Sequence, residues 1–173
     1  MINLEVFTLS NNYIDNIQGL NNQINLRTLN INYNFITKIE GLNNLIKLEV
    51  LELKNNHIDN IQGLDNQINL KILNLSSNNI SKLNGITKLS MLTHIMLHNT
   101  HTKVIDDYLQ IRYCYNLTNI LVDKSTIISP MITYILEYNN MKKSGRKFSI
   151  TDDYMFEILT SSYLSDHTKK DIL

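Results

Sequence analysis

From Leu4 onwards, apolar residues recur along the chain at a constant interval, the one that separates Leu4 from Leu26. Leu4, Leu26, Leu48, Leu70 and Leu92 each begin the same pattern, in which further apolar residues follow three and five positions later. The alternation at the end of this pattern is typical of a short strand with one face turned inward. The pattern therefore predicts a repeat protein whose stacked units bury one another's apolar faces.

The full pattern is L-x-x-L-x-L-x-x-N-x-I-x-x-I-x-G-L, and four consecutive units keep it. Its most similar copies, residues 11–26 and 55–70, differ only at Tyr13/His57 and Asn21/Asp65. Each shared asparagine is expected to end a strand and to hydrogen-bond backbone groups in the bend. Stacked copies would form a ladder of Asn12, Asn34, Asn56 and Asn78. The glycine found once per unit fits a bend where a Cβ atom would be penalised.

These residues resemble the leucine-rich repeat family, specifically its 22-residue intracellular class, typified by a regulatory subunit of protein phosphatase 1. The resemblance covers residues 4–123. It implies an α/β fold, a leucine-rich repeat solenoid with a curved parallel sheet on its concave face. Short helical or irregular turns are expected on the convex face, with helices at the C-terminal end.

We expect two parts in the chain, a solenoid of about five repeats plus a C-terminal cap in residues 1–123 and a helical extension in residues 124–173. The fifth unit departs from the pattern because Thr100 takes the asparagine position. Asp106 or Asp107 is expected to cap a short helix through Tyr115, before a last strand ending at Asp123. Tyr108 matches the tyrosine of the family's C-terminal cap.

The extension is predicted to hold two helices. Ser129-Pro130 is a helix-start signal, and Met131, Ile132, Ile135 and Leu136 follow it on one face. A basic loop is predicted at residues 142–147, and a second amphipathic helix follows Asp153. These helices are interpreted either as a cover for the last repeat or as a partner-binding tail.

Charge and composition indicate which partners and compartments to expect. The 173 residues include 16 Lys and Arg and 16 Asp and Glu, so no charged field should attract nucleic acid or an acidic membrane. The N-terminal sequence lacks the pattern of a signal peptide, and no stretch is apolar for long enough to span a bilayer. Cys114 is the only cysteine, which excludes an internal disulfide framework. We therefore expect a cytoplasmic location, with the nucleus as the alternative.

The sequence offers little for catalysis. The best cluster is His94, His98 and His101, but His94 and His98 on one strand would stand about 13 Å apart, too far to share a metal ion. A phosphate-binding glycine loop and a nucleophile elbow are both missing. We expect no enzymatic activity, cofactor or metal. The alternative is a nucleic-acid-binding or enzymatic role centred on residues 142–147 and the three histidines.

Outward strand positions would form columns across the repeats, on the face that solenoids use for binding. The candidate partner-binding residues are Tyr33, Val50, Glu52, Lys54, Ile72, Asn74, His94, Met96, His98 and Leu121. An alternative explanation of the β-branched residues among them is strand propensity alone. The expected function is a non-catalytic protein–protein interaction module, an adaptor or regulatory subunit.

The expected partner is a protein, and the family resemblance makes a phosphatase catalytic subunit one candidate. Self-association is a further expectation. Only three residues precede Leu4, so the first repeat would leave an apolar end and an unpaired strand edge. A tolerated weak edge is the alternative.

Overall fold

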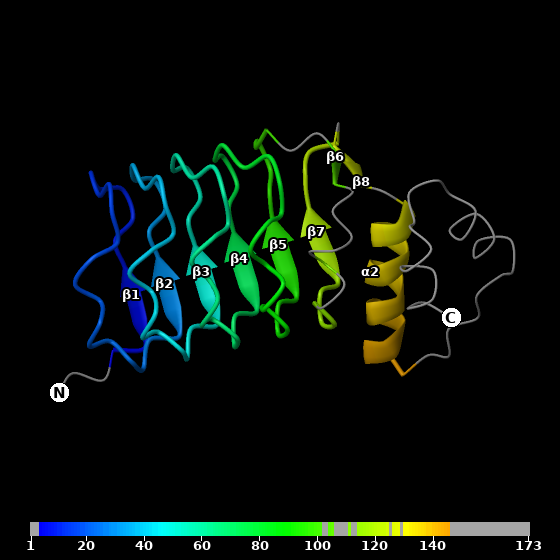
Figure 1. Cartoon of the computed structure of the whole chain (residues 1–173), viewed down its shortest axis with the longest axis horizontal. Coiled ribbons are helices and arrows are strands. Elements are labelled where there is room, and N and C mark those ends of the chain that lie inside the picture. The colour runs from blue at the N-terminus through cyan, green and yellow to red at the C-terminus, as the bar shows by residue number, and fades with distance from the viewer. Residues whose placement is uncertain are drawn as a thin grey trace, which may run out of the picture.

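The computed structural model describes residues 4–101, 104–105, 111, 114–124, 126–128 and 130–145. Six short strands run parallel in one sheet, in the order β1-β2-β3-β4-β5-β7 (Figure 1). They are β1 (Val6–Thr8), β2 (Thr28–Asn30), β3 (Val50–Glu52), β4 (Ile72–Asn74), β5 (His94–Met96) and β7 (Asn119–Leu121). The predicted solenoid with a parallel sheet is confirmed. Among residues 4–101, the segments between strands contain no regular helix.

The repeat period sets the strand register. Phe7 pairs with Leu29, and Leu29 with Leu51, so equivalent residues of successive units lie side by side. The same step continues to β5, whereas Ile95 pairs with Ile120, which is a longer step along the chain. The longer last step reflects the departure of the fifth unit from the pattern.

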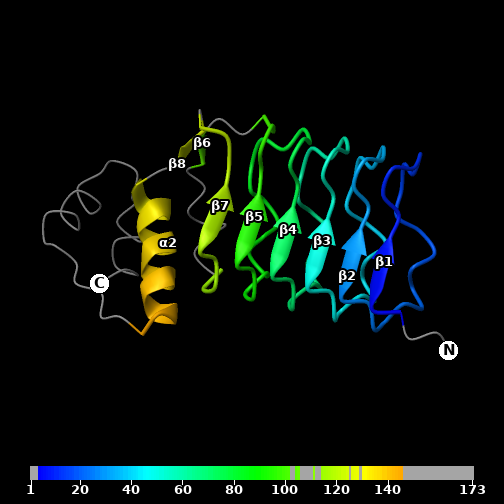
Figure 2. The same cartoon turned by 180° about the vertical axis from the view of Figure 1, so that it is seen from behind.

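All six strands run in the same direction, so two kinds of turn stack along two separate edges (Figures 1 and 2). We call the stacked turns that precede the strands the lower edge, which comprises residues 21–27, 43–49, 65–71, 87–93 and 115–118. The turns that follow the strands, residues 10–15, 32–37, 54–59, 76–81 and 98–101, form the upper edge. The outward side of the sheet, predicted to be concave, is called the sheet face.

Aliphatic side chains from successive units fill the interior as a single core. Leu29, Leu51 and Leu73, the central residues of their strands, are fully buried. Four residues of the first unit are only partly buried: Leu4, Phe7, Leu9 and Ile14. Each unit is covered by its neighbours on both sides, whereas the first described unit has a described neighbour on one side only.

Three of the four predicted ladder asparagines bond to the backbone of two units, whereas the exposed Asn12 bonds only within its own. The Nδ2 of Asn56 donates to the Ile31 oxygen at 3.0 Å and to the Leu53 oxygen at 3.0 Å, and its Oδ1 accepts from the Ile36 nitrogen at 2.9 Å. Asn34 and Asn78 repeat this geometry one unit earlier and one unit later. Each rung therefore satisfies buried backbone groups that the bend leaves unpaired.

Glycine is required where one unit approaches the next. Gly41 and Gly63 adopt φ values of 72° and 92°, in the left-handed region. A Cβ atom on Gly41 would overlap the carbonyl oxygen of Ile17, and one on Gly63 would overlap that of Ile39. The predicted reason for the recurring glycine is confirmed, and the backbone of the preceding unit adds a second one.

A helix follows the last strand of the sheet. α2 (Pro130–Lys143) begins at the predicted proline and buries Ile132 in the same core as the repeats. The Nδ2 of Asn139 donates to the Leu117 oxygen at 2.8 Å, so α2 also satisfies backbone of the final turn. A two-stranded pair, β6 (Val104–Ile105) with β8 (Ile127–Ile128), lies beside it (Figure 2).

One predicted boundary was wrong. The basic loop expected at residues 142–147 begins inside α2, because Lys142 and Lys143 form its last turn. Cations are favoured there by the partial negative charge of a helix C-terminus. Other predictions lie outside the described residues: Asp106, Asp107, Tyr108, residues 146–147 and the second helix.

Candidate protein-binding site

The sheet face consists of three columns of side chains that repeat from strand to strand. The first column holds Val6, Thr28, Val50, Ile72, His94 and Asn119; the second holds Thr8, Asn30, Glu52, Asn74, Met96 and Leu121. Ser10, Asn32, Lys54, Ser76 and His98 follow as the third. The strand pairing therefore places the predicted residues Val50, Ile72 and His94 in the first column, and Met96 and Leu121 in the second.

Polar side chains of the sheet face bond to one another and to nearby backbone nitrogens. Glu52 Oε2 accepts from Asn74 Nδ2 at 2.8 Å and from Asn32 Nδ2 at 3.3 Å. Farther along, Ser10 Oγ donates to Asn30 Oδ1 at 2.8 Å. Much of the hydrogen-bonding capacity at the N-terminal end is thus used within the chain, and these groups are held in fixed positions.

Three of the predicted binding residues have additional structural roles. Asn74 is only 9% exposed, because it lies between Glu52 and the backbone nitrogen of Ser76. Lys54 places its Nζ 5.8 Å from the ring centre of Tyr33, a cation–π contact. Tyr33 is 44% exposed and has a left-handed φ of 58°, so its ring borders the sheet face at the upper edge.

His94 is held by a hydrogen-bonded chain across the last strands. Its Nδ1 lies 2.9 Å from Thr93 Oγ1, and its Nε2 lies 3.0 Å from Asn119 Nδ2. The Thr93 hydroxyl donates to the Lys71 oxygen at 2.9 Å, and the amide nitrogen of Asn119 can only donate. This arrangement fits an imidazole with its proton on Nδ1, so both ring nitrogens are engaged within the chain.

The other groups of the histidine cluster are spread apart. His98 Nδ1 lies 3.7 Å from Asp123 Oδ1, and His101 is exposed. Burial raises the pKa of the Cys114 thiol to about 12, and its Sγ lies 3.3 Å from the Ile86 oxygen. Such a thiol stays protonated and is a poor nucleophile or metal ligand. Within the described residues, no three His, Cys, Asp or Glu side chains are grouped to hold a metal ion.

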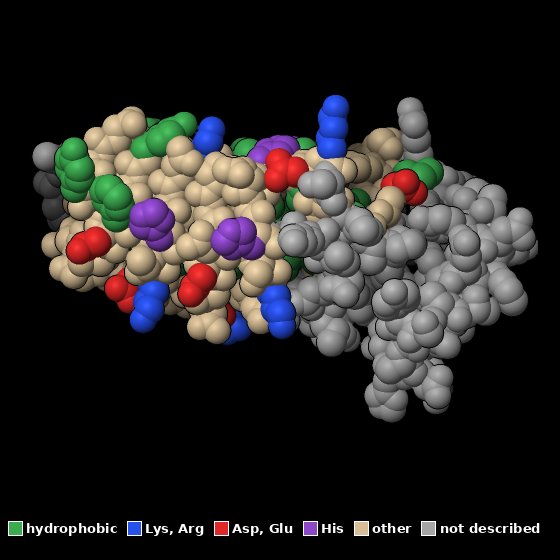
Figure 3. All heavy atoms as spheres, turned by 90° about the horizontal axis from the view of Figure 1, so that it is seen from above, with side chains coloured by type: hydrophobic (Ala, Val, Ile, Leu, Met, Phe, Trp, Pro, Cys, Tyr) green, Lys and Arg blue, Asp and Glu red, His purple; other side chains and the backbone are tan. Residues whose placement is uncertain are grey.

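The sequence reasoning missed most of the exposed apolar surface. Ten large apolar side chains are exposed in the described part of the chain, and only Val6 and Leu121 lie on the sheet face. Tyr13, Tyr33 and Phe35 lie on the upper edge, where Figure 3 shows hydrophobic side chains over the N-terminal turns. Five others lie on the lower edge: Ile24, Ile46, Ile68, Met91 and Tyr115. The equal spacing of the three isoleucines, one in each successive unit, was the available signal.

Comparisons with known proteins identify the repeats. Residues 2–42 and 24–66 each match a family model described as leucine rich repeats (2 copies). The fold is similar to that of an internalin (inlF) from Listeria monocytogenes, with 28% identity, a TM-score of 0.66, and coverage of 76% of this chain and 38% of that chain. An internalin C2 (inlC2) from the same organism gives 25% identity, a TM-score of 0.62, and coverage of 69% and 51%.

A third similar structure is the TLR13–ssRNA13 complex, with 27% identity, a TM-score of 0.51, and coverage of 61% of this chain and 16% of that chain. The chain thus carries leucine-rich repeats and folds as a leucine-rich repeat solenoid. It spans about half or less of the length of each of these structures. Among curated proteins, no sequence matches it. In the described part of the chain, no helix is long and apolar enough to cross a membrane.

Proposed function

We propose that the chain is a non-catalytic protein-interaction module, an adaptor or regulatory subunit, that binds a protein partner on its sheet face. One observation carries this proposal. Partly buried Val50, Ile72 and Met96 and exposed Leu121 lie in adjacent columns, beside polar groups already bonded within the chain. Binding there would bury apolar surface without breaking many hydrogen bonds to water, which is how interface centres contribute most of their free energy.

The charge of the sheet face favours a protein over a nucleic acid. The similar TLR13 structure is a complex with ssRNA. In this chain the three columns hold Lys54 as their only lysine or arginine, against Glu52, and Asp123 follows at the border. A phosphate backbone needs several cations to bind, because release of its counterions supplies the affinity. The face therefore suits an apolar segment of a folded protein.

The resemblance to the 22-residue intracellular class gives the proposal a first partner. By this resemblance, we propose a phosphatase catalytic subunit as the first candidate partner of this chain. The cytoplasm is its proposed location. The repeat fold supports binding of a protein partner, because its stacked strands form a continuous sheet face that a partner can contact.

Two substitutions on the sheet face test the proposal. Ile72→Asp and Met96→Asp together would place two charges in the proposed interface and should weaken partner binding by at least about 100-fold, since each such loss at an interface centre costs about 1–2 kcal/mol or more. Binding is measured by titration against a purified phosphatase catalytic subunit, and by affinity capture with wild-type chain beside the variant. Circular dichroism checks the fold.

Phe35→Asp is the matched control, since Phe35 is an exposed apolar residue outside the sheet face. Partners should bind this variant as they bind wild type. A partner that binds the sheet-face double variant with unchanged affinity would refute the proposed face. Failure of the phosphatase subunit alone to bind would refute the first candidate partner.

A further inference from the structure

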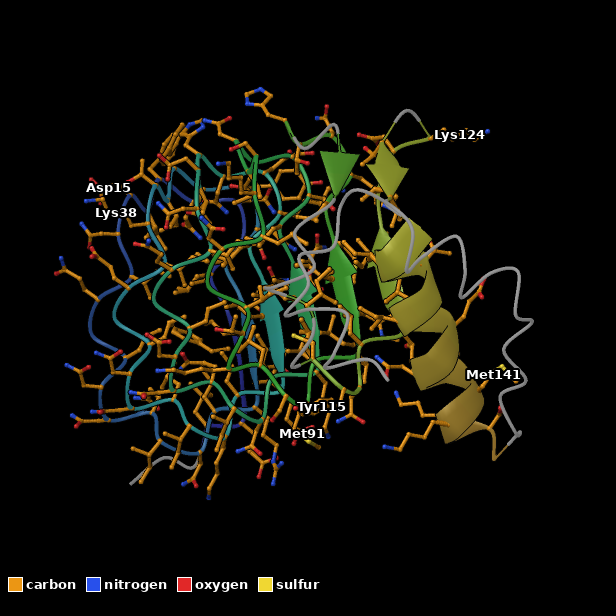
Figure 4. All side chains as sticks on the ribbon, turned by 45° about the vertical axis from the view of Figure 1, so that its right-hand side comes forward. Asp15, Lys38, Met91, Tyr115, Lys124 and Met141 are labelled. Atoms are coloured by element: carbon orange, nitrogen blue, oxygen red, sulfur yellow. The ribbon has the colours of Figure 1, made fainter. Side chains whose placement is uncertain are left out.

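The lower edge carries a row of exposed apolar side chains that no partner within the described chain covers. Ile24, Ile46 and Ile68 occupy the same position in three successive turns and are 54%, 52% and 54% exposed. Met91 and Tyr115 continue the row over the next two turns, and Figure 4 shows them close together at this edge. We call these five residues the tip row. Contiguous exposed apolar surface on a soluble protein commonly marks an interaction site.

Polar neighbours of the tip row are bonded along the edge. Lys47 Nζ lies 2.6 Å from Asn25 Oδ1, and Asn69 Nδ2 donates to the Ile46 oxygen at 2.8 Å. These bonds join one turn to the next and fix the turns in place. The isoleucine side chains therefore project from a rigid edge, and little entropy would be lost when a partner covers them.

A row of alternating charge runs beside the tip row. Arg27, Glu49 and Lys71 stand at equivalent positions of successive units, and Glu49 forms ion pairs with Arg27 on one side and Lys71 on the other. Glu5 holds the equivalent position of the first unit in this row, so negative and positive charges alternate over four successive units. Because opposite signs alternate, two such rows running antiparallel place unlike charges together in one register and like charges together in the next.

We infer that the lower edge binds a second copy of this chain, with the two tip rows running antiparallel. Neighbouring turns stand about 4.8 Å apart, so the tip row is roughly 20 Å long. A second tip row has the same spacing, so its side chains stay in step with those of the first over every turn that the two rows share. An α-helix repeats its apolar side chains about every 5.4 Å and would drift out of register by about 2 Å over four steps.

The charge row selects the register of the two copies. With Ile46 facing Ile46 of the second copy, Glu49 would meet Glu49, and Arg27 would meet Lys71, so like charges would face each other. A shift of one turn places Ile46 against Ile68 of the second copy and Glu49 against its Lys71, while Arg27 faces the uncharged Thr93. This register also places Ile24 beside Met91 and is two-fold symmetric.

The pairing leaves the sheet face open, so it is separate from the proposed function. Ile72→Asp with Met96→Asp should leave the association of the two copies unchanged. The two copies can fail to associate while the sheet face still binds its partner. They can also associate while the sheet face binds no partner.

Substitution of the tip row tests the association directly. Sedimentation velocity of the full chain from about 5 to about 500 µM should show reversible dimers. Ile46→Asp with Ile68→Asp should raise the dissociation constant at least about 100-fold, since each charge enters the symmetric interface twice. Phe35→Asp on the upper edge is the matched control and should dimerise as wild type does.

Charge reversal tests the register. A variant with Glu5→Lys, Arg27→Glu, Glu49→Lys and Lys71→Glu keeps the alternation within each chain and should dimerise as wild type does. Mixed with tagged wild type, however, it should form at least about 10-fold fewer mixed dimers than two wild-type samples do, because like charges would then face each other.

Three results would overturn the inference. The first is a wild-type chain that stays monomeric over the whole concentration range. The second is a dimer that persists unweakened in the variant with both Ile46 and Ile68 replaced. The third is efficient mixing of wild type with the charge-reversed variant. A monomer that instead sediments with neutral phosphatidylcholine vesicles, and loses this binding on the same isoleucine substitutions, would assign the tip row to a lipid surface and also overturn it.

Discussion

Residues 11–26 and 55–70 are almost the same sequence, yet they have different environments in the fold. In the later copy Ile58, Ile61 and Leu64 are at most 1% exposed, whereas in the earlier copy Ile14 is only partly buried. Asn56 is buried, while its equivalent Asn12 is exposed and bonds only to backbone of its own unit. The difference lies in the neighbours, because the later copy is stacked between two described units.

The comparison shows where the stability of this fold originates. A unit buries its apolar residues in contacts with the units before and after it, so the same side chain contributes more in the middle of the stack. Substituting one residue of a central unit and the equivalent residue of the first unit therefore measures the contribution of stacking. Equal effects within a pair would contradict this account.

The largest difference is expected at the asparagine ladder. Asn56→Ala removes three hydrogen bonds to buried backbone and leaves those groups without partners, which should lower the free energy of unfolding by about 4 kcal/mol. Asn12→Ala should cost under about 1 kcal/mol, because water can replace its exposed bonds. Urea unfolding followed by circular dichroism measures both variants.

The next difference is expected in the aliphatic core. Ile58→Ala leaves a cavity at a fully buried site and should cost about 3 kcal/mol in the free energy of unfolding. Ile14→Ala should cost about 1 kcal/mol, since part of that side chain already meets water. Thermal unfolding of the two variants beside wild type measures the gap. A smaller loss for Ile58→Ala than for Ile14→Ala would rule out the stacking explanation.

A smaller difference should separate the two glycines. Gly63→Ala places a methyl group against the Ile39 carbonyl in a left-handed conformation, and it should destabilise the fold by about 2 kcal/mol or more. Gly19 has a similar φ of 77°, but a Cβ atom there meets nothing within 4 Å. Gly19→Ala should therefore cost only the conformational penalty, about 1 kcal/mol. Guanidinium unfolding midpoints of the two variants give the comparison.

The smallest effect, and a pH-dependent one, is expected at the charge row. Hydrogen bonds from Lys71 and Arg27 hold the pKa of Glu49 below its ordinary value of 4.5. The carboxylate therefore adds stability at neutral pH, and this contribution is lost as pH falls from 4.5 through the lowered folded-state pKa. Glu49→Gln should be slightly less stable than wild type at pH 7, and the gap should close once the pH is below the lowered folded-state pKa of Glu49. Glu5→Gln should show a smaller gap at pH 7, because Glu5 has a described neighbour in this row on one side only.

The candidate sites could be predicted from the sequence to different degrees. The repeat period was enough to place Val50, Ile72 and His94 in one column of the sheet face, because parallel strands in register keep equivalent residues adjacent. The same period contained Ile24, Ile46 and Ile68, but one apolar residue in a turn does not reveal whether it faces the core or water. Their exposure follows from the direction in which each side chain points, which the periodic pattern does not fix.

The bonding on the sheet face was also beyond the sequence. Asn74 was a plausible contact residue by its column, yet its amide is almost buried between Glu52 and Ser76. Its role depends on rotamers in two adjacent units, and a periodic pattern fixes positions without fixing side-chain directions. Likewise, His94 is engaged on both ring nitrogens by residues that are one and 25 positions away.

The sequence by itself determined the repeat, the register of the sheet, the asparagine ladder and the recurring glycine, because each depends on identical residues meeting at a fixed interval. The tertiary structure decided how much each copy is buried, which polar groups bond to one another, and which apolar side chains stay in water. Those properties depend on what lies on either side of a unit, and two nearly identical stretches of sequence carry no record of their different neighbours.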